Sequence, residues 1–166
     1  MRRPLTRLGL GLLLFAALAW ACGDKLMLVM GAGSSLIKPL HPAAILAYPG
    51  HTPSASLIRE LQSQAAFRKV GHRIQFVEDS AGLNNALKTG KYDVVLTDVA
   101  NASELSEQVS AAASKPVLLP VAFQASKEEQ SAAQKKYHCL LKAPGKPEDY
   151  LAAIDHAMDL RLKKAR

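Results

Sequence analysis

Cysteine and aromatic residues are scarce in this 166-residue chain, and each shortage excludes a class of protein. Two cysteines are too few for a disulfide-rich scaffold, and their spacing supports no metal site. Aromatic residues make up 5% of the chain and are not interleaved with the basic ones, so we expect no nucleic-acid binding. The length suits one ordinary domain and rules out a TIM barrel.

The basic excess lies mostly at the two ends of the chain. Residues 1–21 hold three arginines and no acidic residue; without them, 18 basic and 14 acidic residues remain, a net charge of +4. Four of the remaining basic residues form a tail: Arg161, Lys163, Lys164 and Arg166. We interpret this tail as the solvated end of a last helix; the alternative is a weak contact with anionic lipid or another polyanion.

Residues 1–21 are predicted to be a bacterial secretory signal peptide. A basic start is followed by the apolar run Leu8–Trp20 and by a small-x-small cleavage site that ends at Ala21. The run is shorter than the roughly 20 residues of a transmembrane helix, although an uncleaved anchor is the alternative. We therefore expect an exported protein, either periplasmic or anchored to a membrane.

Cys22 follows the cleavage site directly and resembles the acylated cysteine of bacterial lipoproteins. The preceding Ala21 fits the lipobox, whereas the bulky Trp20 and the Ala19 in place of leucine depart from it. Two outcomes stay open: acylation of Cys22, which would tether the chain to a membrane, or simple cleavage. Cys139 lies in an apolar run and is predicted to be a small buried residue.

The rest of the chain divides into an extension and one domain. Residues 22–42 form the extension, with one strand predicted at Lys25–Met30 and prolines at its end. In residues 43–166, strands alternate with helices. The predicted strands are Ala43–Tyr48, Arg73–Val77, Asp93–Leu96, Pro116–Phe123, which Pro120 interrupts, and Cys139–Lys142. The first helix is predicted over Ser54–Val70, and five helices in all predict a doubly wound, flavodoxin-like α/β fold with a five-stranded parallel sheet.

Three segments of this domain resemble the receiver domain of bacterial response regulators. Gly90–Asp98 looks like its third strand, Lys115–Leu119 like its fourth and Leu141–Pro144 like its fifth, within a resemblance that covers about residues 43–160. The resemblance implies that Asp98 occupies the place of the phospho-accepting aspartate. It also implies that Lys142 occupies the place of the family's lysine, which a proline follows.

The phosphotransfer chemistry of the family is not expected to survive. Phosphoryl transfer needs a divalent cation beside the accepting carboxylate, and acidic residues at the end of the first strand help to hold it. No Asp or Glu occurs between Asp24 and Glu60, and Val121-Ala122 stands where the family has a hydroxyl. We therefore expect Asp98 and Lys142 to form a relic ion pair, in a protein that is not an enzyme and uses no metal or cofactor.

The five histidines show no spacing typical of a metal site. We expect them to face solvent: His41, His51, His72, His138 and His156.

Two functions from different classes remain. The first is a non-catalytic module that binds another envelope protein or a second copy of itself. By the resemblance, its face would comprise Glu128–Tyr137, Leu140–Lys142 and Asp149–Met158, with Tyr137 and Tyr150 as candidate contacts; the alternative for either tyrosine is a place in the core. The second is binding of a small ligand at the carboxyl edge of the sheet, by Thr52, Asp79, Asn101 and Ser126. A phosphorylatable receiver at Asp98 is the least favoured reading.

Overall fold

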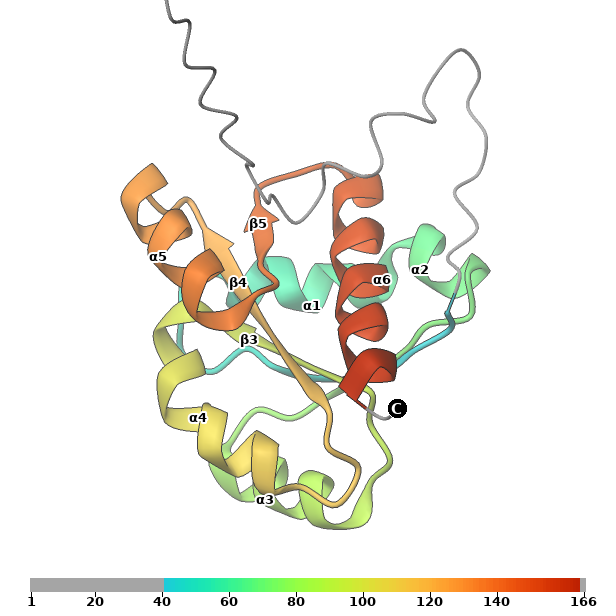
Figure 1. Ribbon diagram of the computed structural model, residues 1–166. Helices are drawn as coiled ribbons and strands as arrows, with labels where there is room; N and C mark the ends of the chain where they lie inside the picture. Colours follow the sequence, from blue (N-terminus) through green and yellow to red (C-terminus); the bar gives the residue numbers. More distant parts are fainter. Residues whose placement is uncertain (1–40, 165–166) are drawn as a thin grey trace, which may run out of the picture.

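The structure is a computed structural model that describes residues 41–164 (Figure 1). The predicted signal peptide, Cys22, the strand Lys25–Met30 and the last tail residue, Arg166, lie outside the described residues. No helix within residues 41–164 is both long and apolar enough to span a membrane.

The predicted fold class is confirmed. All five strands run parallel in one sheet of order β2-β1-β3-β4-β5, the order of a flavodoxin-like fold. The strands are β1 (Ala44–Tyr48), β2 (Arg73–Phe76), β3 (Val94–Asp98), β4 (Val117–Phe123) and β5 (Leu141–Ala143). The helices are α1 (Ala55–Ser63), α2 (Ala65–Lys69), α3 (Ser80–Thr89), α4 (Val99–Ala111), α5 (Lys127–Tyr137) and α6 (Pro147–Lys164).

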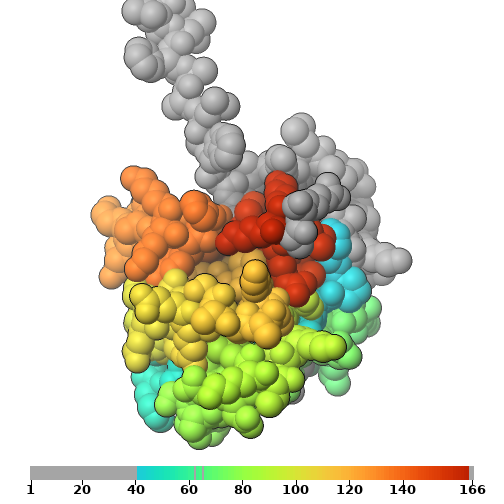
Figure 2. Space-filling model, turned by 60° about the horizontal axis from the view of Figure 1, so that its bottom comes forward, coloured from blue at the N-terminus to red at the C-terminus, as the bar shows by residue number. Residues whose placement is uncertain are grey.

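Helices cover both faces of the sheet. The core on one face joins α1, α2 and α6 to alternate residues of the strands, such as Ile45, Leu96 and Leu141. The intervening strand residues, such as Leu46 and Val95, pack against α3 and α4, while Ala122 packs beneath α5. Figure 2 looks onto this second face, where α3, α4 and α5 follow one another in green, yellow and orange. All five residues of β3 are buried, as its central place requires.

The predicted helix Ser54–Val70 is wrong in one respect, because the structure divides it into α1 and α2. Gln64 leaves the helical conformation, with φ −66° and ψ 120°, and separates the two. The short α2 places Phe67 in the same core as Ile58 and Leu61, with only 1% of Phe67 exposed.

Pro120 does not interrupt β4, contrary to the prediction. Successive residues of a strand direct their N–H groups to opposite neighbours. The N–H of Val117 donates to the carbonyl of Asp93, just before β3, and the N–H of Gln124 donates to the carbonyl of Ala143 in β5. Because Pro120 is an even number of residues from Gln124, its nitrogen also faces β5. Pairing with β5 begins only at Val121, and Pro120 therefore stands where β4 has no ladder bond to lose.

Candidate functional site

Asp98 is the last residue of β3 and caps the helix that follows. Its Oδ1 accepts a 2.8 Å hydrogen bond from the backbone N–H of Ala100, in the first turn of α4. An acidic N-cap of this kind is favourable because it satisfies a helix N–H group that has no partner within the helix. The side chain is nearly enclosed, with 6% of the residue exposed.

The second oxygen of the Asp98 carboxylate is also occupied. Ser54, which is fully buried at the start of α1, donates its hydroxyl to Asp98 Oδ2 at 2.5 Å. Thr52 Oγ1 lies 3.1 Å from Ser54 Oγ and donates to the carbonyl of Pro49 at 2.8 Å. Ser54 was not among the residues predicted for the site, because nothing in its local pattern indicates that a helix-preceding serine meets a residue 44 positions away.

The expected ion pair between Asp98 and Lys142 is not formed, and the sheet register explains why. Asp98 is level with Val121, and Val121 with Leu141, so these three side chains share one face of the sheet. Lys142 is the next residue along β5 and projects from the opposite face, where it is exposed. On Asp98's own face the end of β5 carries Ala143, which directly precedes Pro144.

The loop after β1 closes the edge of the sheet next to Asp98. Pro49 and Gly50 are buried, and Gly50 has a positive φ of 59°. A β-carbon at Gly50 would lie 2.7 Å from Asn101 Nδ2, so the loop backbone packs directly against α4. Ligands of this fold often bind at the point between β1 and β3 where the strand order reverses, and here the buried residues Pro49 and Gly50 follow β1 at that point.

The four residues expected to form a ligand edge are not gathered in one place. Thr52 is linked to Asp98 through Ser54, and Asn101 lies against Gly50. Asp79 caps α3 by accepting a 2.6 Å hydrogen bond from Gly82 N–H. Ser126 caps α5 in a reciprocal capping box with Glu129. Within residues 41–164, no three His, Cys, Asp or Glu side chains are grouped so that they could hold a metal ion.

The carboxyl end of β4 opens instead into a groove between α4 and α5, with a volume of about 530 Å³. Lys136 donates to Ser103 Oγ at 2.8 Å, and Tyr137 Oη lies 3.0 Å from the same oxygen, so the two helices are joined across the groove. Its lining is mainly apolar, with polar side chains at the rim: Val99, Ser103, Phe123, Gln124, Ala125, Glu129, Ala132, Ala133, Lys136 and Tyr137.

Of the two tyrosines expected on an interaction face, only Tyr137 lines this groove. Tyr150 is buried, with 3% exposed, and its hydroxyl accepts a 2.7 Å hydrogen bond from Gly145 N–H. It therefore belongs to the core beneath α6. Cys139 is buried as predicted, and its thiol donates to the carbonyl of Ala153 at 3.4 Å.

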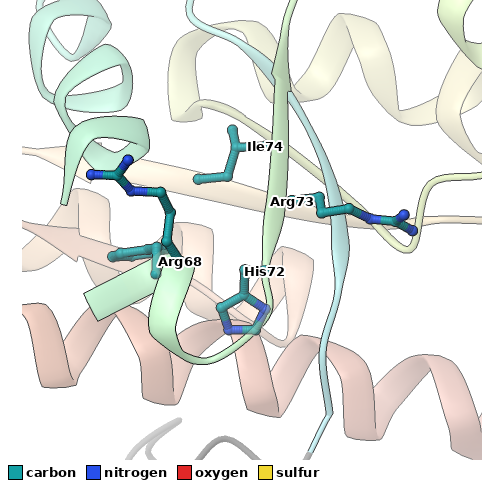
Figure 3. A pocket seen from close by; sticks show the side chains of 5 residues that line it. Arg68, His72, Arg73 and Ile74 are labelled. Atoms are coloured by element: carbon teal, nitrogen blue, oxygen red, sulfur yellow. The ribbon is translucent and has the colours of Figure 1, made fainter. Parts of the chain in front are cut away.

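His72 is buried, contrary to the expectation that the histidines face solvent. The residue is 5% exposed, and its Nδ1 accepts a 3.1 Å hydrogen bond from Ala43 N–H. Burial lowers the pKa of His72 below its usual range, and the charge of Asp155 opposes this lowering. His72 also lines a smaller hollow of about 280 Å³ beside β2, which Figure 3 shows from close by.

A scan against protein-family models and a search of curated proteins both found no match.

Proposed function

We propose that this chain is an exported, receiver-like domain that acts as a non-catalytic protein-interaction module of the bacterial envelope. The observation that carries the proposal is the state of the Asp98 carboxylate. Ser54 and Ala100 engage its two oxygens, and the residue is almost fully buried. Such a carboxylate is held for a structural purpose and is poorly placed to attack an incoming phosphoryl group.

The surroundings of Asp98 support the same proposal. A transferring phosphoryl group needs cationic partners, either a metal ion or a lysine. Lys142 projects from the other face of the sheet, and the loop from Tyr48 to Ser54 supplies no acidic side chain to hold a cation.

The groove between α4 and α5 is the surface that we propose for the partner. Its apolar floor, formed in part by Val99 and Phe123, suits an apolar side chain. Lys136 at the rim suits an acidic group next to that side chain, because Lys135 and Lys136 place two positive charges in the last turn of α5. The partner is therefore proposed to be a protein segment that pairs an apolar anchor with a carboxylate.

Incubation with acetyl phosphate and Mg²⁺ tests the non-catalytic part of the proposal. We expect the intact mass of the full chain, purified in mild detergent, to stay unchanged, as for an Asp98→Asn control. A phosphoryl group gained by the unmodified chain and not by the control would overturn it.

Site-specific crosslinking tests the groove. A photoreactive benzoylphenylalanine is placed at Ala132, which lines the groove, or at Ser131, its exposed neighbour outside the lining. In the producing cells we expect a protein adduct from position 132 and none from position 131. Equal adducts from both positions, or none from either, would contradict the proposed surface.

A small ligand is the second candidate function, and the groove also favours it, because it lies at the carboxyl end of a strand in a parallel sheet. Shifts of the Val99 and Ala125 methyl resonances on addition of small-molecule fragments would support this reading. Unchanged resonances across a fragment set would speak against it.

A further inference from the structure

The described chain begins beside the hollow next to β2. Phe67, Arg68, His72, Arg73 and Ile74 line this hollow of about 280 Å³ (Figure 3). The turn between α2 and β2 packs against the first described residues, since a β-carbon built on Gly71 would lie 3.5 Å from Pro42 Cβ. The preceding part of the chain is therefore attached to the domain next to this hollow.

The outer edge of β2 offers unpaired backbone groups. Within residues 41–164, β2 pairs with β1 alone. Arg73 and Val77 donate their N–H groups to Ala43 and Ala47 on the β1 side. Since the direction alternates along a strand, the backbone N–H and C=O groups of Ile74 and Phe76 face outward. An edge of this kind is a template for a further strand.

The side chains of the same two residues mark where such a strand would bury its apolar face. Ile74 and Phe76 are half-buried and pack at the margin of the core that includes Phe67 of α2. Figure 3 shows Ile74 and Arg68 on the side of β2 away from β1. The hollow thus lies between α2 and the outer edge of β2, and it is open to side chains from a strand added there.

We propose that Lys25–Met30 of this same chain is that strand, paired antiparallel to β2 with Met30 beside Ile74 and Leu28 beside Phe76. The segment reads Lys-Leu-Met-Leu-Val-Met and has one charged residue, at its first position. Alternation places Leu26, Leu28 and Met30 on the face of the hollow, and Lys25, Met27 and Val29 on the other face.

Chain length and direction fit an antiparallel strand. Ten residues separate Met30 from His41, and these can span up to roughly 33 Å. An antiparallel strand ends near the amino end of β2, close to where β1 begins, whereas a parallel strand would require a crossover along the whole sheet. An antiparallel strand at the edge of an otherwise parallel sheet is a common arrangement.

Amide hydrogen exchange of the full chain in mild detergent tests this strand. We expect the amides of Ile74 and Phe76 to exchange at least 10-fold more slowly than in a Leu28→Asp/Met30→Asp variant, which places two charges on the apolar face. A Ser34→Asp/Ser35→Asp variant carries the same added charge outside the strand and should keep the slow exchange. The amides of β1 should be unaffected in all three proteins.

Three outcomes would overturn the proposal. The first is fast exchange at both Ile74 and Phe76 in the unmodified chain. The second is slow exchange that persists in the Leu28→Asp/Met30→Asp variant. The third is protection that grows with protein concentration, because it would assign the β2 edge to a second copy of the chain.

Discussion

Arg161 Nη1 of α6 lies 2.7 Å from Asp93 Oδ1, in the residue that precedes β3. The other Asp93 oxygen accepts a 2.8 Å hydrogen bond from Ala44 N–H at the start of β1. Arg161 also donates to the carbonyl of Ser114 at 3.2 Å. This basic residue was expected to belong to a solvated tail. It instead ties the last helix to the amino ends of two strands.

Replacing Arg161 should therefore destabilise the fold, while replacing a neighbouring tail residue should not. The pair is partly buried, with 29% of the Arg161 side chain and 23% of the Asp93 side chain exposed. Arg161→Ala is expected to lower the free energy of unfolding by about 1–2 kcal/mol, between the values of exposed and buried charged pairs. Urea unfolding measures it, with the exposed Lys163→Ala as control. Equal losses in the two variants would contradict the role of the pair.

The hydrogen bond from Ser54 to Asp98 gives a second prediction. Ser54→Ala removes one donor from a buried carboxylate and should cost about 1–3 kcal/mol of unfolding free energy. Ser56→Ala changes an exposed serine of α1 and should cost less than about 0.5 kcal/mol. The unfolding free energies of the two variants are compared from the midpoints of their urea unfolding curves, with the same slope of free energy against urea concentration for both. A Ser54→Ala variant as stable as Ser56→Ala would show that Ser54 does not support Asp98.

The buried His72 predicts a pH dependence of stability. Burial lowers the pKa of His72 in the folded state below 6.5, whereas the unfolded chain keeps the ordinary value. The unfolded state therefore takes up a proton first on acidification. The stability contribution of neutral His72 is complete above pH 6.5 and is lost as pH falls through the folded-state pKa.

Thermal unfolding between pH 7.5 and 5 measures this effect. The unmodified chain should lose more stability on acidification than a His72→Gln variant, whose side chain can still accept from Ala43 N–H and does not titrate. A His51→Gln variant removes an exposed histidine and should keep the full pH dependence. Parallel pH profiles for the unmodified chain and His72→Gln would contradict the prediction. The other charged groups near His72, which are Asp155, Arg68 and Arg73, are the same in all three proteins and therefore do not account for a difference between the pH profiles.

The sequence predicts the sheet well because its strongest signals are local. The continuous apolar run within Asp93–Leu96 was predicted to be a buried strand, and it lies in β3, whose five residues are all buried. The break at Gln64 was not predicted, because the apolar spacing of Leu57, Ile58, Leu61 and Ala65 runs across it without interruption.

The candidate site was less predictable, because it depends on register. The fifth strand was predicted to end at Lys142, whereas β5 runs from Leu141 to Ala143. The local sequence does not report the register in which β5 pairs with β4: Val121 pairs with Leu141, and this register places Lys142 on the opposite face of the sheet from Asp98. The groove between α4 and α5 arises from the relative placement of two helices, and no local pattern reports that placement.

The complete burial of Cys139 makes its thiol a natural probe of how often the domain opens. Its sulfur lies under α6 against the Ala153 carbonyl, with 0% of the residue exposed. A thiol reagent can modify it only when the packing of α6 on β5 opens. The modification rate of Cys139 in native buffer, followed on its own peptide and at reagent concentrations where reaction is faster than reclosing, therefore measures how often the last helix opens, without any engineered probe.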